Sequence, residues 1–337
     1  MLIGSIGGDM GTYKEVLHSQ ISELQQLLGS RWKYYGVGRD DGKEKGEYSP
    51  IFYNSRRFEL VRSQTKWLSL SPDQPGSKGW DAASVPPAHS LEYSKAQTRI
   101  ATFVTLRDSL VVKDSTDSSG ADRSGIIHVV NTHYDDQGRK ARQESSLVLR
   151  AETRKWVDDD TSSGGKAGAA QAGLILLGDL NSPEDEKGYK TLVSLEPLRY
   201  KIPYFSFQDC YLHLSTRGGP RRPVAEGTKT ADAQAGFGTI TQSASSGPRG
   251  TYTGFAPPGQ EADERIDVVM LALEETVVGE SSTKGPDDVG TLPTRGGLVP
   301  TKYVVVDNLL AGRGDIVGWT GRWSDHRAVM VEISFGT

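Results

Sequence analysis

The sequence predicts an α+β protein in which two β-sheets pack against each other and helices lie outside them. Segments rich in β-branched and aromatic residues are typical of strands, and they are too numerous for one doubly wound sheet. Only a few helical segments lie between them. The chain has 337 residues and the mixture of apolar and charged residues of a globular protein, so it can bury a large core.

The predicted elements follow one another along the chain. A helix is expected over 13–28, because apolar residues recur there at helical spacing and Gly29 ends the pattern. Further helices are expected over 138–157 and after Pro183. Strands are predicted at 48–54, 58–62, 65–70, 99–107, 126–133, 173–179, 265–273, 302–310 and 327–335.

Three segments have the composition of surface loops, namely 113–125, 159–172 and 214–250. None of them separates two self-contained sets of strands. We therefore expect a single domain over residues 1–337, with an atypical start at 1–13.

Composition excludes several classes of protein. With 39 basic and 43 acidic residues the net charge is −4, which does not favour broad attraction to nucleic acid but is compatible with a local basic groove. No apolar run could cross a bilayer, and residues 1–13 lack the pattern of a secretory signal. The single cysteine, Cys210, fits a reducing compartment. We expect a cytoplasmic protein with no transmembrane segment and no obligate protein partner.

Polar side chains recur where predicted strands begin or end. The segment LILLGDLNS at 174–182 ends a buried strand in Asp179 and Asn181, whose side chains point the same way because alternate strand residues share a face. Each such residue, taken alone, is also compatible with an ordinary turn. Asp267 fits that interpretation least, because its predicted position is buried and needs a partner such as a histidine. The other strand-edge residues of this kind are His133, Asp325 and His326.

These residue types suit the hydrolysis of a phosphate ester. Carboxylates with oxygen-bearing neighbours and no cysteine cluster favour a hard cation such as Mg²⁺, whose shell is completed by water and substrate phosphate. Two histidines, each near a carboxylate, suit hydrogen-bond donors to a phosphate whose charge rises in the transition state.

The ordered motifs resemble the endonuclease/exonuclease/phosphatase superfamily. They are KEVLHSQ with Glu15, NTHYDD with His133, GDLNS with Asp179 and Asn181, RIDVVM with Asp267, and SDHRAV with Asp325 and His326. The segments YYGVGRDDGKEKGEYSPIFYN and WLSLSPDQPGSKGWDAAS look like a little-characterised branch found in bacteria and fungi. The resemblance implies a four-layer α/β/β/α sandwich of two mixed β-sheets flanked by helices.

The resemblance also implies a role for each matched residue. Glu15 and Asp325 would face the metal, which is expected to be Mg²⁺ with Mn²⁺ as a possible substitute. Asp179 would orient and deprotonate the attacking water. Asn181 would hold the same region of the phosphate.

The remaining implied roles concern the phosphate. Asp267 would bond to His326 and keep it protonated against the phosphate, and His133 would contact the phosphate as a second donor. Arg99, at the start of a predicted strand, would be a further phosphate contact.

Two departures from the family pattern stand out. The family begins with a strand bearing an Asn near the metal, then a helix and a strand leading to Gln-Glu, whereas only thirteen residues precede Lys14-Glu15 here. The first strand and its Asn are therefore expected to be missing, which would leave neighbouring strands unpaired. The alternative is that residues 1–12 fold into the gap and that MLIGSI forms a stand-in strand. The segment 85–98 is longer than the family needs and is expected to be a loop insertion.

Three functions are compatible with the sequence. The first is Mg²⁺-dependent hydrolysis of a small or medium phosphorylated substrate. The second is a nuclease on DNA or RNA, for which the basic segment 215–223 would contact phosphates and Tyr252 or Phe255 would stack on a base. The third is a catalytically impaired protein that lacks the first strand of its family.

Overall fold

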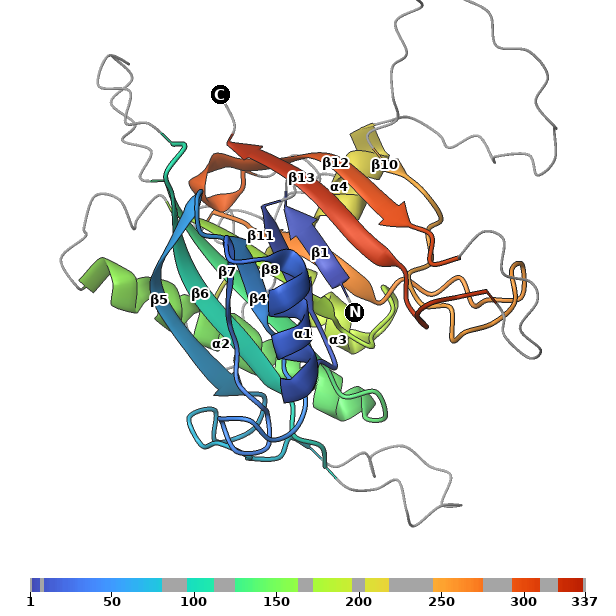
Figure 1. Cartoon of the computed structure of the whole chain (residues 1–337), viewed down its shortest axis with the longest axis horizontal. Coiled ribbons are helices and arrows are strands. Elements are labelled where there is room, and N and C mark those ends of the chain that lie inside the picture. Colours follow the sequence, from blue (N-terminus) through green and yellow to red (C-terminus); the bar gives the residue numbers. More distant parts are fainter. Residues whose placement is uncertain are drawn as a thin grey trace, which may run out of the picture.

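A computed structural model describes residues 2–6, 9–80, 96–111, 125–162, 172–195, 204–217, 245–274, 293–309 and 321–335. Within these residues two mixed β-sheets pack face to face, with helices on their outer sides (Figure 1). No described helix is long and apolar enough to cross a membrane.

One sheet has seven strands in the order β10-β12-β13-β1-β2-β4-β3. β1 runs parallel to β13, and β2 runs antiparallel to both β1 and β4, so the sheet is mixed. The strands span Leu2–Ile6 (β1), Met10–Tyr13 (β2), Trp32–Tyr35 (β3), Ile51–Asn54 (β4), Ser245–Ser246 (β10), Leu298–Val306 (β12) and Ala328–Phe335 (β13).

The other sheet has six strands in the order β5-β6-β7-β8-β11-β9. Its central pair, β7 and β8, is parallel, and β11 lies antiparallel to β8. The strands span Phe58–Trp67 (β5), Ile100–Asp108 (β6), Ile126–His133 (β7), Gly173–Asp179 (β8), Phe207–Asp209 (β9) and Asp267–Ala272 (β11). The two strands predicted at 58–62 and 65–70 are thus one continuous strand, β5.

Helices complete the outer layers. Helix α1 (His18–Leu28) packs on the seven-stranded sheet through Ile21. On the six-stranded sheet lie α2 (Arg139–Ser162) and α3 (Lys187–Val193), whose buried residues include Trp156 and Leu192. Helix α4 (Cys210–Arg217) follows β9, and a short 3₁₀ helix (Arg295–Gly297) precedes β12. This arrangement confirms the predicted four-layer sandwich.

The main core lies between the two sheets. It joins residues such as Met10 and Val329 of the seven-stranded sheet to Val129 and Val269 of the six-stranded sheet. Asn131 of β7 adds a polar link, because its amide donates to the carbonyl oxygens of residues 13 and 50 at 2.9 and 3.1 Å. These contacts fix how the ends of the two sheets meet.

The start of the chain differs from the prediction in two ways. The predicted gap is filled, because Leu2–Ile6 forms β1 between β13 and β2 and so pairs both neighbours. The expected helix over 13–28 begins only at His18, because residue 13 ends β2 and Glu15 has a left-handed backbone (φ 56°).

The predicted loops are shorter than expected where they are described. Helix α2 continues to Ser162, into the predicted loop 159–172. Helix α4 extends to Arg217, because Leu214 is buried in the main core. Most of 113–125, 163–171, 218–244 and the predicted insertion at 85–98 lies outside the described residues.

Candidate functional site

Strand register brings three predicted residues to one edge of the six-stranded sheet. In the parallel pair of β7 and β8, His133 is the partner of Asp179. In the antiparallel pair of β8 and β11, Asp267 is also the partner of Asp179. Buried apolar residues precede Asp179 in β8 and follow Asp267 in β11, so packing of these strands fixes the positions of the polar residues.

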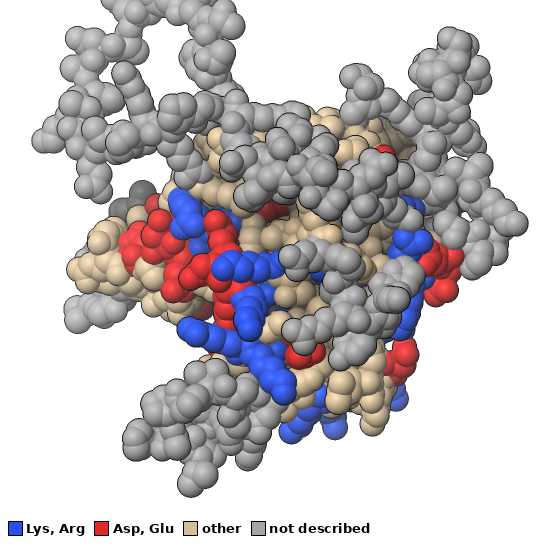
Figure 2. Space-filling view, turned by 180° about the vertical axis from the view of Figure 1, so that it is seen from behind, with Lys and Arg blue, Asp and Glu red and all other residues tan. Residues whose placement is uncertain are grey.

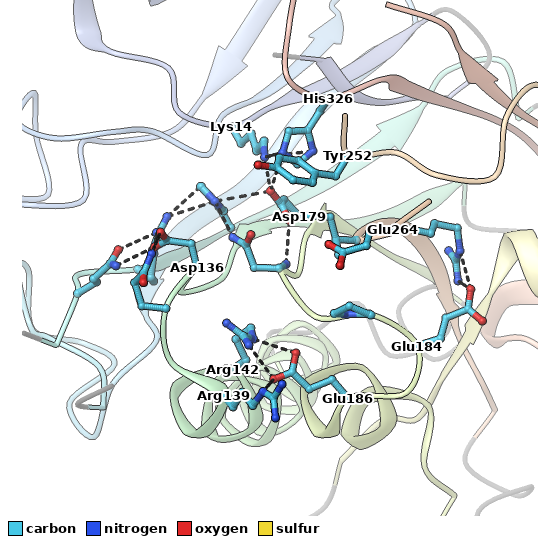
Figure 3. Close-up of a pocket in the computed structure, with 18 of the residues that line it drawn as sticks. Lys14, Asp136, Arg139, Arg142, Asp179, Glu184, Glu186, Tyr252, Glu264 and His326 are labelled. Carbon is cyan, nitrogen blue, oxygen red and sulfur yellow. Dashed lines mark hydrogen bonds and ion pairs between the residues drawn. The ribbon is translucent and has the colours of Figure 1, made fainter. Parts of the chain in front are cut away.

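The seven-stranded sheet supplies the opposite side of the site. Glu15 follows β2, while Asp325 and His326 precede β13. These residues line a cavity of about 1570 Å³ together with His133, Asp179, Asn181, Arg99 and Tyr252. Figure 3 shows side chains from both sheets converging on it. Asp267 is the one predicted residue that does not line the cavity, because it lies against His326.

Asp267 and His326 form a buried pair. Asp267 Oδ2 lies 2.7 Å from His326 Nδ1, and the Asp267 side chain has no exposed surface. Burial lowers the pKa of His326, but the charge and hydrogen bond of Asp267 and the nearby Asp179 outweigh it, so the pKa rises above its ordinary value of 6.5. The imidazole ring is thus oriented by Asp267, which favours its charged form, while the charge of the nearby Lys14 opposes that form.

Asp179 and Asn181 form a tight turn at the end of β8. The backbone N–H of Asn181 donates to Asp179 Oδ1 at 2.8 Å, and Asn181 has a left-handed backbone (φ 46°). The Asn181 amide donates to the carbonyl oxygen of Tyr134 at 3.0 Å and lies 3.1 Å from His133 Nε2. Both side chains are held by several bonds, as a reacting group and its neighbour require.

His133 lines the cavity beside Arg99 and Asn181, and its role as a donor to phosphate stays a prediction. Burial lowers its pKa well below 6.5, and the charges of Arg99 and Lys14 lower it further, so the ring is neutral. Its Nδ1 lies 3.0 Å from Arg99 Nη1, so Nδ1 can accept from the guanidinium. Its Nε2 lies 3.1 Å from the Asn181 amide nitrogen and 3.7 Å from Asp179 Oδ2, so the N–H of the neutral ring can point from Nε2 to a carboxylate. Arg99, which also donates to Asp136 at 2.9 Å, carries the charge on this side of the cavity.

Lys14 is a site residue that sequence reasoning missed. Its side chain is 1% exposed, and its ammonium contacts Asp179 Oδ2 and lies 2.9 Å from His326 Nε2 (Figure 3). Burial lowers the pKa of Lys14, but Asp179, Asp267 and Glu15 raise it above 10.5, so the group is charged. The only sequence signal was its position beside Glu15.

The carboxylates provide two sets of donors for a metal. Asp179, Asp267 and His326 have potential ligand atoms within 4.8 Å of one another, but they already bond to each other or to Lys14. Glu15 and Asp325 line the same cavity, and the Glu15 side chain is 46% exposed. These two oxygen donors fit a hard cation such as Mg²⁺, which binds few protein carboxylates and keeps several waters.

The rest of the cavity wall is charged and partly cross-linked. Arg142 pairs with Glu186 at 2.7 Å, and the buried Arg265 pairs with Glu184 at 2.9 Å. The Tyr252 ring lies edge-on to His326, with ring centroids 4.9 Å apart, and so covers one side of that histidine. The ion pairs on this wall were not predicted, because each joins residues far apart in the sequence.

Comparison with solved structures reveals the same fold in other proteins. A Bacteroides thetaiotaomicron mannosyl-6-phosphatase has a TM-score of 0.60 and 22% identity, covering 97% of this chain and 85% of that chain. An endonuclease/exonuclease/phosphatase from Bacteroides vulgatus has a TM-score of 0.58 and 21% identity over the same shares. The human Nocturnin catalytic domain with bound sulfate has a TM-score of 0.50 and 14% identity, covering 97% and 80%. The sequence matches no protein-family model and no curated protein.

Proposed function

Because the chain has the fold of the endonuclease/exonuclease/phosphatase proteins, we propose that it hydrolyses a phosphate ester with the help of a divalent metal ion. The observation that carries this proposal is the buried group of Asp179, Asp267 and His326 at a large cavity, with Glu15 and Asp325 beside it. A base, a charged donor and metal-suited carboxylates are thus close together.

The chain's own residues account for the proton transfers and the charge. Asp179 accepts a proton from water as the water oxygen bonds to phosphorus and the ester P–O bond breaks, and the leaving oxygen takes a proton from solvent. His326, held by Asp267, donates to a phosphate oxygen whose negative charge increases. Asn181 and Arg99 contact the same phosphate.

Glu15 and Asp325 would hold the metal, with Mg²⁺ as the expected ion and Mn²⁺ as a substitute. The bound ion would stabilise the negative charge of the phosphate as a Lewis acid.

The cavity supports a small or medium phosphorylated substrate. Its volume of about 1570 Å³ exceeds the roughly 300–1,000 Å³ of usual small-molecule sites, so a small or medium substrate fits within it, but the volume does not select for that size. The charged wall suits a polar molecule with hydroxyl or further phosphate groups. A mannosyl-6-phosphatase of the same fold is compatible with this substrate class.

No described feature favours a nuclease over this proposal. Most of the basic segment 215–223 lies outside the described residues. Tyr252 packs against His326, and of the two predicted stacking rings Phe255 is the exposed one, at 51%. On the face seen in Figure 2, basic and acidic side chains are interspersed among the described residues. Single-stranded nucleic-acid sites usually combine a basic groove with free aromatic rings. The impaired-protein alternative loses its main support, since β1 pairs with both neighbouring strands.

The experiment is an activity panel with matched variants. Sugar phosphates, inositol phosphates, nucleotides, nucleic acids and sphingomyelin are tested with Mg²⁺ and with chelator. Asp179→Asn and His326→Ala should each lower the rate by roughly 10²–10³-fold, because one removes the base and the other the donor. Asp158→Asn, on a carboxylate of α2 that pairs with Arg154, is the control and should leave the rate unchanged. Near-parental rates in both site variants would refute the assignment.

A further inference from the structure

The ammonium of Lys14 occupies the centre of the acidic group. It contacts Asp179 Oδ2, lies 2.9 Å from His326 Nε2 and lies 4.0 Å from Glu15 Oε1. The carboxylate assigned as the base and the carboxylate assigned to the metal therefore already share a cation. This cation belongs to the chain itself.

The position of Lys14 follows from the local backbone. β2 ends at residue 13, and the left-handed conformation of Glu15 turns the chain immediately afterwards. The Lys14 side chain is thereby directed inward and is 1% exposed, while Glu15 is directed into the cavity and is 46% exposed. Two adjacent residues thus bring a positive group and a negative group to the same part of the cavity.

A divalent ion at Glu15 would lie close to this ammonium. Two cations within a few ångströms repel each other strongly where little water is present to screen them. They would also compete for the Glu15 carboxylate, which lies 4.0 Å from the Lys14 ammonium. Lys14 lines the cavity, so its ammonium has space into which it can move.

We propose that Lys14 is a tethered cation that competes with the divalent metal for the Glu15 carboxylate beside Asp179, and that the metal binds by displacing its ammonium. This inference rests on the proposed metal site. In this proposal the chain itself supplies a cation, the Lys14 ammonium, at that site. When no metal is bound, this ammonium pairs with the buried carboxylate of Asp179.

The first test measures binding of Mn²⁺ to the full chain by the loss of the free Mn²⁺ signal in electron paramagnetic resonance. Lys14→Gln should bind Mn²⁺ about 10- to 100-fold more tightly than the parent, the size of effect typical of groups next to a metal ligand. Lys66→Gln is the matched control, because Lys66 also pairs with a buried carboxylate, Glu152, but does not line the cavity. Equal or weaker binding by Lys14→Gln would overturn the proposal.

The second test uses the parent chain, so it does not depend on the folding of a variant. Amine acetylation read by mass spectrometry should modify Lys14 slowly without metal and several-fold faster at saturating Mn²⁺, while Lys66 reacts at one rate. If Lys14 were acetylated equally slowly with and without saturating Mn²⁺, the proposal that the metal displaces the Lys14 ammonium would be overturned.

These results are separable from the failure of the proposed function. Tighter Mn²⁺ binding by Lys14→Gln without any phosphate ester hydrolysis would support the competition and count against the reaction. Hydrolysis in a parent chain that binds no Mn²⁺ would overturn the competition and leave the ester hydrolysis standing.

Discussion

Replacing Asp267 by Asn should destabilise the protein most strongly at mildly acidic pH. The substitution removes a buried carboxylate that bonds His326 at 2.7 Å and leaves the imidazolium without its anion. Breaking a buried pair by removing one partner costs about 3–5 kcal/mol, and the amide retains one hydrogen bond, so we expect about 3 kcal/mol.

The pH window follows from both members of the pair. The pKa of His326 is raised above 6.5, so its contribution to stability is fully present below that value and is lost as pH rises through the raised pKa. The pKa of Asp267 is lowered from 3.8, despite burial that raises it, mainly by the charge of His326. Its contribution is present above 3.8 and is lost as pH falls through the lowered pKa. The parent should therefore exceed Asp267→Asn most in free energy of unfolding between the lowered pKa of Asp267 and the raised pKa of His326.

Urea unfolding followed by tryptophan fluorescence measures this difference at about pH 5.5 and about pH 9. We expect the difference in free energy of unfolding between parent and Asp267→Asn to be smaller at the higher pH, because the contribution of His326 is lost as pH rises through its raised pKa. The free energy of unfolding of Asp158→Asn should differ from that of the parent by a small amount that is the same at both pH values, because its partner Arg154 stays charged. An Asp267→Asn effect of equal size at both pH values would refute the charged-pair reasoning.

Two further predictions concern the metal and the strand register. Glu15→Gln should raise the half-saturating Mg²⁺ concentration about 10- to 100-fold, because a neutral amide holds the ion less well, and an unchanged titration would argue against Glu15 as a ligand. Gly178→Ala should lower stability by about 1–3 kcal/mol, because its methyl group would overlap the carbonyl oxygen of Thr132 and separate β8 from β7. It should also lower turnover by moving Asp179 relative to His133, and thermal melting identical to the parent would contradict it.

The strand-rich half of the fold was predictable from local pattern. Buried strands such as β6, β7 and β8 are rich in apolar and β-branched residues. The polar residues at the end of β8, at the start of β11 and before β13 marked Asp179, Asp267 and His326 correctly as neighbours. Short elements carry too few residues for such a signal. β9 and β10 have three and two residues, and they were therefore missed.

The structure at the start of the chain and the charge states of the side chains in the site were less predictable. The apolar spacing at 13–28 continues through a strand end and a turn, so it placed the start of α1 five residues too early. β1 is short and contains glycine, and it forms a strand because it pairs with both β13 and β2. Lys14 and the neutral state of His133 depend on burial and on distant charges, which local sequence does not contain.

The bond between Asp267 and His326 joins the two sheets and so has a consequence for the order of folding. Asp267 begins β11 of one sheet, and His326 leads into β13 of the other, 59 positions later in the sequence. Each sheet can gain its own hydrogen bonds before the two meet, but this pair cannot form until they dock. An intermediate with both sheets formed and still apart would hold every side chain of the site and would have no reaction centre.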